Sequence, residues 1–344
     1  MSEVPIRLSD THFHSKAQMN PSDLASPTLV NKRTSLRNNK PHASRRRTKI
    51  TTDALTSAQP APFLKWAGGK RALLGEIRPR VPSFSGKYVE PFLGAGAVLF
   101  DQSPELRKLA SDYNPNLVEV YEVIRDNPDE LLDALRAHQN TAEHYYSVRA
   151  WDRTADFLSR SKVERAARFI YLNKCGYNGL YRVNAKGQMN VPYGSSPNAD
   201  YIAEANLRAV SAFLGRRDPS GNLLTQIISG DYRLALASAV PGDFVYCDPP
   251  YAPISPTSAF VSYTSDGFGK DQQTELRDQL KDLTDKGVLL LLSNSDVPLI
   301  RELYDDENYF RIESVSVRRA ISATAAGRGK VNEVLVSNYH AVRG

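Results

Sequence analysis

The chain of 344 residues has little cysteine and no long hydrophobic run, and both absences narrow its class. Its two cysteines, Cys175 and Cys247, cannot form a disulfide framework or a four-cysteine zinc site. No run of about 18 apolar residues occurs, so no membrane span is expected. The N-terminus also lacks the apolar core that is typical of a signal peptide. We therefore expect a cytoplasmic protein in a reducing compartment.

Histidine is scarce too, and its placement gives no sign of a metal site. Three of the six histidines lie within the first 60 residues, and none shows the spacing of metal ligands. Cys247 stands inside an apolar run, where cysteine usually behaves as a small buried side chain. Neither metal catalysis nor covalent catalysis through Cys247 is expected.

The net charge of +6 lies entirely in residues 1–60. This segment contains ten Lys or Arg and four Asp or Glu, whereas the remaining residues contain 34 of each sign. It is rich in Ser, Thr, Asn and Pro and has no sustained periodicity, which predicts a disordered basic tail. The basic cluster Arg45, Arg46, Arg47 and Lys49 is either part of a solvated tail or a non-specific contact to nucleic acid.

From residue 61 onward, strand-like and helix-like segments alternate, with one helical interruption. Alternation in residues 61–126 and 218–344 predicts an α/β catalytic domain with helices on both faces of its sheet. Residues 127–217 are mostly helical and predict an inserted subdomain. The expected strands are residues 87–90, 107–111, 224–229, 243–247, 288–292, 310–318 and 331–339, the last two as an antiparallel pair. The expected helices are residues 70–80, 95–102, 115–125, 128–138, 142–150, 162–173 and 271–286.

A glycine turn follows the first expected strand. Gly94 and Gly96 allow backbone to approach a ligand where a Cβ would clash, although the full dinucleotide fingerprint is missing. A tight packing turn is the alternative. Asp112 stands just past the next strand, about 20 residues on, where an acidic side chain can accept both hydroxyls of a ribose. Asp112 would otherwise cap the helix that starts near Pro115.

A second dense segment consists of Lys65, Trp66, Ala67, Gly68, Gly69 and Lys70. A tryptophan beside two glycines and two lysines is unusual at the entrance of a domain. The segment is either a surface turn with a half-buried Trp66, or a site where Trp66 and Lys70 surround a cofactor while Lys65 faces DNA.

The turn Asp248, Pro249, Pro250 and Tyr251 follows a buried strand and has a specific chemical rationale. The N6 lone pair of adenine is delocalised into the ring and is a poor nucleophile. The Asp248 carboxylate, and a backbone carbonyl whose direction proline geometry fixes, would accept the two amino hydrogens and localise that lone pair. Tyr251 can stack on the base. A proline-punctuated loop without catalytic function is the alternative.

The same turn predicts methyl transfer to a base. The amine would attack the sulfonium methyl group of S-adenosyl-L-methionine, helped by positioning and electrostatics. A base in duplex DNA cannot reach such a pocket unless it flips out of the helix.

These segments resemble the Dam-type DNA adenine-N6 methyltransferases of the D12 class, over residues 63–339. The resemblance implies a Rossmann-like S-adenosylmethionine-dependent sheet with an inserted target-recognition subdomain. It implies a monomeric, site-specific enzyme of bacteria or phages that methylates adenine N6 in duplex DNA within GATC. The residues that match the family's cofactor site are Trp66, Lys70, Glu90, Pro91, Phe92, Gly94, Asp112, Tyr232 and Asp248. Those that match its catalytic motif are Asp248, Pro249 and Tyr251.

Residues 172–182 and 190–194 closely resemble the recognition hairpin of that family. The residues that match its DNA contacts are Lys65, Lys174, Tyr177, Asn178, Leu180, Arg182 and Pro192. By this resemblance Tyr177 and Asn178 would brace the gap left by the flipped adenine, and Arg182 would read a guanine. Lys174 stands where an arginine is common, and Ser195 where a basic residue is frequent, so weaker phosphate clamping is expected there.

Two other classes of function remain open. One is a related amino-methyltransferase that acts on cytosine N4, RNA or a protein glutamine, although such enzymes usually carry Ser or Asn in place of Asp248. The other is a DNA-binding protein without catalysis, against which the intact turn argues. The sequence also leaves open whether the enzyme is solitary, phage-borne or paired with a restriction nuclease.

Overall fold

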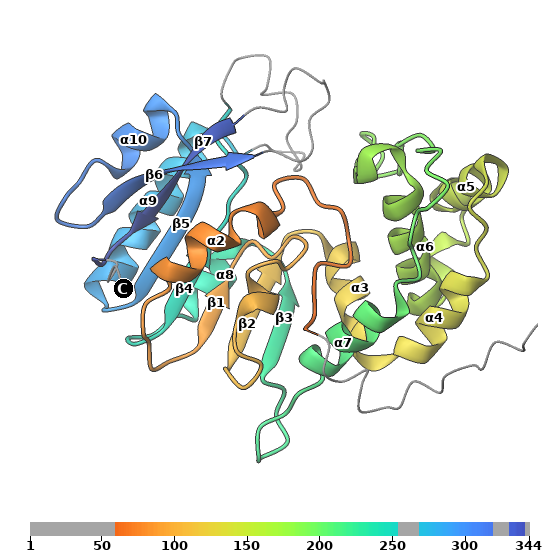
Figure 1. Cartoon of the computed structure of the whole chain (residues 1–344), viewed down its shortest axis with the longest axis horizontal. Coiled ribbons are helices and arrows are strands. Elements are labelled where there is room, and N and C mark those ends of the chain that lie inside the picture. The colour runs from red at the N-terminus through yellow and green to blue at the C-terminus, as the bar shows by residue number, and fades with distance from the viewer. Residues whose placement is uncertain (1–58, 254–267, 319–329, 341–344) are drawn as a thin grey trace, which may run out of the picture. The chain divides into compact units, whose positions relative to one another are not determined.

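The structure is a computed structural model that describes residues 59–253, 268–318 and 330–340. The expected tail therefore lies outside the described residues, apart from its last two. The strands are β1 (Tyr88–Glu90), β2 (Lys108–Asp112), β3 (Thr225–Ser229), β4 (Phe244–Cys247), β5 (Leu289–Ser295), β6 (Arg311–Arg318) and β7 (Lys330–Ser337). They form one sheet of seven strands in the order β3-β2-β1-β4-β5-β7-β6 (Figure 1).

Strand direction gives the sheet a Rossmann-like, mixed character. The five strands from β3 to β5 are parallel, whereas β7 is antiparallel to both β5 and β6. Since the carboxyl ends of parallel strands meet at one edge, Glu90, Asp112 and Cys247 end their strands on the same side of the sheet. The expected α/β class is confirmed, and so is the antiparallel pair at the C-terminal end.

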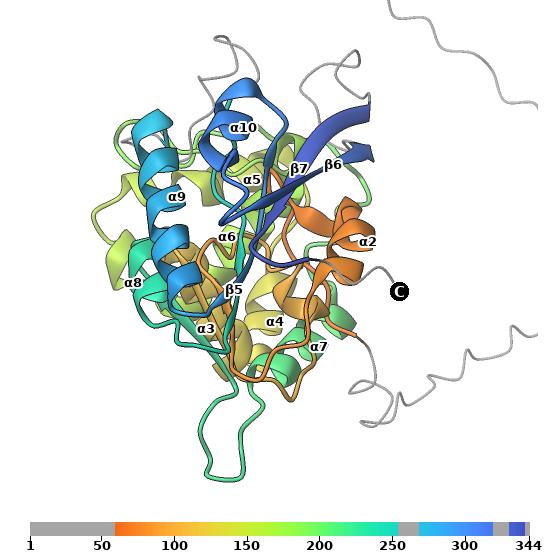
Figure 2. The same ribbon diagram turned by 90° about the vertical axis from the view of Figure 1, so that its left-hand side faces the viewer.

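Helices cover both faces of the sheet. They are α2 (Leu74–Ile77), α3 (Pro115–Asp126), α4 (Pro128–Arg136), α5 (Ala142–Arg149), α6 (Lys162–Cys175), α7 (Glu204–Leu214), α8 (Tyr232–Ala237), α9 (Lys270–Asp285) and α10 (Pro298–Tyr304). Apolar side chains of α8, α9 and α10 pack against one face of the sheet, and those of α2 and α3 pack against the other (Figures 1 and 2). Central strands such as β4 are fully buried, which explains their continuous apolar sequence.

Helices α4 to α7 lie between α3 and β3 in the chain and form a separate group beside the sheet (Figure 1). Helix α6 packs against α3, α4 and α5, and α7 packs against α3. Local signals begin α6 sharply, because Ser161 and Glu164 form a capping box. Helix α3 thus joins the helical group to the sheet.

Two expected helices are wrong in length. Residues 95–102 form turns and the short 3-10 helix η3 (Leu99–Asp101), because Gly94 and Gly96 adopt φ values of 49° and 69°. Residues 70–80 break into η1 (Lys70–Ala72), α2 and η2 (Arg78–Arg80), with Pro79 in the last turn. The other 3-10 helices are η4 (Ala150–Arg153), η5 (Phe157–Ser159) and η6 (Tyr177–Gly179).

Candidate active site

The glycine turn after β1 is tied to the end of β2 by Asp112. The Asp112 carboxylate accepts hydrogen bonds from the backbone N–H of Gly94 and of Asn114, both at 2.9 Å. Burial raises the pKa of this carboxyl group above its usual range. The cap of helix α3 is Asn114, whose side chain accepts from the N–H groups of Asn116 and Leu117, so the capping interpretation of Asp112 is wrong.

Two hydroxyl groups also fix the backbone of this turn. The carbonyl of Gly94 accepts the Tyr121 hydroxyl at 2.9 Å, and the carbonyl of Pro91 accepts the Ser111 hydroxyl at 2.9 Å. A Cβ built on Gly94 would lie 2.9 Å from a Trp66 ring carbon, so a larger residue would collide with the indole. The backbone here is therefore packed on one side and fixed by hydrogen bonds.

The buried Lys70 and the half-buried Asp248, which are 178 positions apart in the sequence, form an ion pair. The Lys70 Nζ lies 2.6 Å from the Asp248 Oδ1, and only 6% of the lysine side chain is exposed. Ser293, in the last part of β5, donates to the same carboxylate at 3.1 Å, and the Tyr246 hydroxyl is 2.9 Å from the Ser293 hydroxyl. Burial raises the pKa of Asp248, and Lys70 and Ser293 oppose that rise.

Glu90 is the second buried acid of this region. Burial raises its pKa to about 8, against a hydrogen bond of 2.6 Å that the Tyr88 hydroxyl donates to its carboxylate. The negative charge of Asp248 adds to the rise, and Lys70 opposes it. At neutral pH the Glu90 carboxyl group, at the end of β1, is therefore mostly protonated and uncharged, beside the Lys70–Asp248 pair.

The turn after β4 is clamped by polar side chains that sequence patterns did not single out. Gln273 of α9 donates to the Pro250 carbonyl at 2.8 Å and accepts from Asn294 at 3.2 Å. Asn294 in turn accepts from the Ala252 N–H at 3.1 Å. Pro249 is buried, and none of the described residues donates a hydrogen bond to its carbonyl. In the sequence, the only indication of these contacts was the polar run Ser293, Asn294 and Ser295, which follows the aliphatic part of the strand.

Tyr251 is fixed at its far end and lies next to the ion pair. Its hydroxyl donates to Glu333 of β7 at 2.8 Å, and the Lys70 ammonium lies 4.5 Å from the centroid of its ring. Lys70, Asp248 and Tyr251, which come from two distant segments, therefore meet at one edge of the sheet.

Phe92 and Tyr232 belong to an aromatic cluster on the α8 side of the sheet. Their rings stack at 5.0 Å, and Phe268 packs edge-on against both at 5.9 Å. The Tyr232 hydroxyl is buried and has no hydrogen-bond partner among the described residues. Such an unpaired hydroxyl suits a ligand with polar edges.

Trp66 lies between the glycine turn and the helical group. Its indole stacks on Tyr181 at 5.6 Å and on Phe169 of α6 at 6.2 Å. Its neighbour Lys65 is exposed, and Asn173 of α6 holds both the N–H and the carbonyl of Lys65 at 2.9 and 2.8 Å. Trp66 is thus half-buried, and it contacts the helical group as well as the expected cofactor turn.

Five of the expected DNA contacts, Tyr177, Asn178, Leu180, Arg182 and Pro192, lie on a turn and hairpin that follow α6. Tyr177 is 50% exposed, Asn178 has φ of 54°, and the Tyr177 N–H donates to the Pro192 carbonyl at 2.9 Å. Arg182 is exposed, and its Nε donates to Asn190 at 2.7 Å, whereas Leu180 is half-buried. Burial lowers the pKa of Lys174; the negative charge of Asp200 opposes this shift, whereas the positive charges of Lys65 and Arg71 add to it. Three basic side chains, Lys174, Lys65 and Arg71, thus lie close to one another, with the acid Asp200 nearby.

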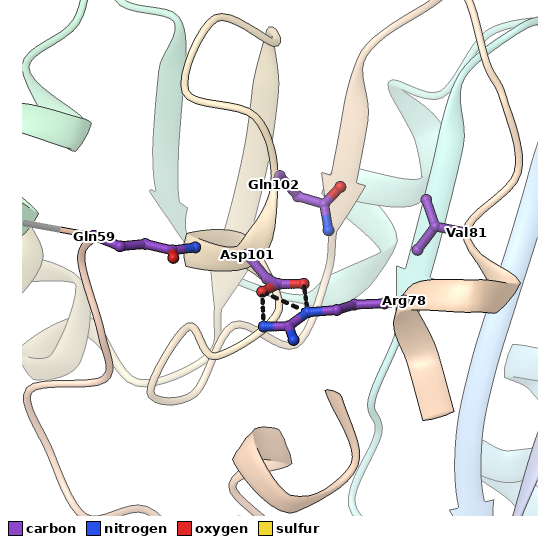
Figure 3. Close-up of a pocket in the computed structure, with 5 residues that line it drawn as sticks. All are labelled: Gln59, Arg78, Val81, Asp101 and Gln102. Carbon is purple, nitrogen blue, oxygen red and sulfur yellow. Dashed lines mark hydrogen bonds and ion pairs between the residues drawn. The ribbon is translucent and has the colours of Figure 1, made fainter. Parts of the chain in front are cut away.

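A hollow lies apart from these residues, beside η2 and η3 (Figure 3). Its lining residues are Gln59, Arg78, Val81, Asp101 and Gln102. Arg78 and Asp101 satisfy each other through hydrogen bonds of 2.6 to 3.0 Å. None of the expected site residues lines this hollow.

Clustered metal ligands and membrane-crossing helices are both absent from the described ranges. No group of three His, Cys, Asp or Glu in this part of the chain is placed to hold a metal ion. Among the helices that the structure describes, none combines the length and apolar character required to cross a membrane.

Comparison with known proteins agrees with this geometry. The family model for D12 class N6 adenine-specific DNA methyltransferases matches residues 66–321. A type II methyltransferase, M1.LlaDCHI of Lactococcus lactis, is 43% identical over 81% of this chain and 95% of its own length. The type II methyltransferase M.MjaIII of Methanocaldococcus jannaschii is 38% identical over 81% of this chain and 99% of its own.

The DNA adenine methylase of Escherichia coli K12 is 36% identical over 79% of this chain and 93% of its own length. The family model covers well over half of the chain, and these relatives are matched over almost their whole length. The chain belongs to the D12 class of N6 adenine-specific DNA methyltransferases.

Proposed function

We propose that this DNA adenine methyltransferase transfers a methyl group from S-adenosyl-L-methionine to N6 of an adenine flipped out of duplex DNA, within GATC. The observation that carries the proposal is the meeting of Asp248, Tyr251 and Lys70 near Glu90, which ends β1 just before the glycine turn of Gly94. One edge of the sheet thereby offers an acceptor for an amine and a turn for a nucleoside cofactor.

The cofactor would lie over the ends of β1 and β2. Each Asp112 oxygen already accepts one backbone N–H and retains a lone pair, so both remain able to accept ribose hydroxyls. Trp66, Pro91 and Phe92 would line the site, and the unpaired hydroxyl of Tyr232 would meet the polar edge of the cofactor's base. When bound, the cofactor supplies an electrophilic methyl group.

Glu90 and Lys70 would hold the methionine end of the cofactor. Glu90 has a raised pKa of about 8, so an approaching ammonium group would lower that pKa and favour the ionised carboxylate, and the proton of Glu90 would be released to solvent. Lys70, only 6% exposed, would keep Asp248 ionised against the effect of burial.

The catalytic residues would act on the amine of adenine. A free oxygen of Asp248 and the Pro249 carbonyl would accept its two hydrogens, which localises the lone pair on nitrogen. Tyr251 would stack on the base and fix the direction of attack. In this arrangement Asp248, Pro249 and Tyr251 would stabilise the transition state more than they would tighten binding of the substrate.

DNA recognition would fall to residues 127–217 together with Lys65, while residues 61–126 and 218–344 would form the catalytic domain. Arg182 is held through Nε by Asn190, which would direct its two terminal nitrogens to the O6 and N7 acceptors of a guanine. Tyr177 and Asn178 would brace the gap left by the flipped base, and Leu180 and Pro192 would touch base edges. Lys174 would contact phosphate, and the protein would act as a monomer.

Methylation of duplex DNA in the presence of S-adenosyl-L-methionine, followed by sequencing of the modified positions, tests the proposal. We expect N6-methyladenine within GATC. Asp248→Ala should lower turnover by at least about 100-fold, as loss of a transition-state acceptor does, and should leave DNA binding in place. Asp101→Asn, an acid of the remote hollow, is the matched control and should keep parental turnover.

Two results would contradict parts of this proposal. Turnover of Asp248→Ala within about tenfold of the parent would remove the catalytic assignment. Methylated adenines in sequences other than GATC would support the proposed reaction but contradict the proposed target sequence.

A further inference from the structure

Glu333 is a buried acidic side chain of strand β7 that immediately precedes the apolar run Val334, Leu335 and Val336. It is 7% exposed, and Val334, Leu335 and Val336, which follow it, are almost fully buried. It stands opposite Ser295 of β5 and Val315 of β6. A carboxylate inside a sheet costs free energy unless a hydrogen bond compensates for the missing water. An acid at this position therefore calls for a specific partner.

That partner is the hydroxyl of Tyr251, which donates to Glu333 Oε2 at 2.8 Å. The opposite end of Tyr251 is its backbone, which is fixed by the turn that Gln273 and Asn294 clamp. One face of its ring also meets the Lys70 ammonium at 4.5 Å. The ring of Tyr251 is thus held at both ends, and its plane is determined.

We propose that Glu333 is a positioning residue for methyl transfer: by holding the Tyr251 hydroxyl, it fixes the plane of the ring on which the target adenine stacks. The inference rests on the proposed stacking role of Tyr251. A tilt of this ring would carry the amine away from Asp248 and from the methyl donor, and displacements of about 1 Å can cost about 100-fold in rate. Glu333 thereby acts through Tyr251 and does not touch the substrate itself.

The charge of Glu333 has a second, separable effect. Burial is the main cause of the raised pKa of Asp248, and the nearby negative charge of Glu333 adds to it. Glu333→Gln removes the charge but keeps an oxygen that accepts the Tyr251 hydroxyl. Glu333→Leu removes both at similar volume. The two variants therefore separate the hydrogen bond from the charge.

The experiment is a double-mutant cycle on full-length protein, with kcat, KM for GATC duplex and melting temperature measured for each variant. Glu333→Leu and Tyr251→Phe should each lower kcat by about tenfold, the scale of a hydrogen bond to a charged group, with KM little changed. The double variant should be no slower than the slower single variant, because both changes remove the same hydrogen bond. Glu333→Gln, which keeps an accepting oxygen, should have a kcat within about threefold of that of the parent.

Ser337→Ala is the matched control, since Ser337 is a buried polar residue on the same strand and face but bonds Tyr339 instead. It should keep parental kcat. Multiplicative losses in the double variant would overturn the proposal, and so would a slow Glu333→Gln. If Glu333→Leu does not fold, Tyr251→Phe alone still tests the proposal. A parental kcat in Tyr251→Phe would show that the hydrogen bond to Glu333 is not needed for turnover. A parent that does not methylate adenine would instead overturn the proposed function on which this role rests.

Discussion

At the scale of single residues, the site contains two acids, Asp248 and Glu90, whose pKa values are both raised by burial but whose partners differ. Asp248 has a partner of opposite charge at 2.6 Å, whereas the hydrogen-bond donor to Glu90 is the neutral hydroxyl of Tyr88. An ion pair favours the charged form of an acid more strongly than a neutral donor does. The two carboxyl groups can therefore carry different protonation states at neutral pH, as the proposed roles of Asp248 in catalysis and of Glu90 in cofactor binding require.

Glu90 makes the stability of the cofactor-free protein depend on pH. Its pKa is about 8 in the folded protein and 4.5 as its ordinary value, so between these values the folded state keeps a proton that the unfolded state has released. Stability from this group is complete below the lower value and is lost as pH rises toward 8. Relative to Glu90→Gln, the parent's free energy of unfolding should fall by up to about 1.4 kcal/mol per pH unit.

Urea denaturation of both proteins from about pH 5 to about pH 8 checks this expectation, because the stability difference isolates the single titration. A difference that does not vary with pH would mean that Glu90 is ionised throughout, with Lys70 compensating for its burial.

Asn173 holds two segments that are proposed to contact DNA. Its fully buried amide binds both backbone groups of Lys65 and also donates to the Gly179 carbonyl at 2.9 Å. Asn173→Ala should lower stability by about 1–3 kcal/mol, the cost of unpaired polar groups. It should also weaken discrimination at more than one position of GATC, because both segments lose their common support.

Asn206→Ala is a close control, since Asn206 makes the same pair of hydrogen bonds to Ala61, at 2.9 Å each. It should lower stability without changing discrimination. Methylation rates on GATC and on sites altered at one position distinguish the two variants. Equal effects of both on discrimination would mean that general loosening of the N-terminal segment, and not Asn173 itself, sets specificity.

At the scale of elements, periodicity predicted most strands and long helices to within a few residues. It failed where polar side chains continue a strand: the expected strand ended at residue 292, but β5 extends to Ser295. Ser293 and Asn294 look like the start of a loop in sequence, yet they reach Asp248 and Ala252 across the sheet. Such contacts join residues more than 40 positions apart, and no local pattern contains them.

The same limit applies to the site as a whole. The two motif segments suggested a cofactor turn and a catalytic turn, and parallel strands bring both to one edge. The direct pairing of Lys70 with Asp248, and of Glu333 with Tyr251, could not be predicted, because it depends on side-chain placement between remote segments. The position of Glu333 directly before the apolar run Val334–Val336 was the only hint in the sequence.

The segment that contains Trp66 connects the sheet with the helical group. Its indole stacks on Phe169 and Tyr181, which stack on each other at 4.6 Å, and it also abuts the turn at Gly94. Trp66→Ala should therefore weaken binding of both S-adenosyl-L-methionine and duplex DNA, each by about tenfold, as loss of an aromatic stack permits. Equilibrium binding of each ligand alone measures these effects.

Trp151 provides the comparison, because it packs within the helical group against Arg160, at 4.0 Å from the ring, and against His138. Trp151→Ala should lower the melting temperature and leave cofactor affinity unchanged. If Trp66→Ala weakened the binding of only one ligand, the aromatic stack would be part of that ligand's site and would not connect the cofactor site with the DNA site.

At the scale of the whole molecule, charge is divided unequally along the chain. Residues 61–344 carry equal numbers of acidic and basic groups, so their attraction to DNA depends on local surfaces such as Lys65, Arg71 and Lys174. Long-range attraction to a polyanion must come mainly from the net charge of +6 in residues 1–60. This charge distribution predicts that specific reading and general attraction reside in different parts of the sequence.

Deletion of residues 1–58, which contain all of that excess charge, tests this division. Turnover and melting temperature should stay close to those of the full chain. Non-specific DNA affinity should fall, and its dependence on salt should flatten by about 0.9 in the logarithmic slope for each phosphate that the tail no longer neutralises. Preference for GATC should persist, because phosphate contacts carry no direct sequence information. A full-length variant with Arg45, Arg46, Arg47 and Lys49 changed to Gln should shift the slope in the same direction. A truncated protein that melts at a clearly lower temperature, or that methylates a different sequence, would show that residues 1–58 contribute structure or recognition beyond their charge.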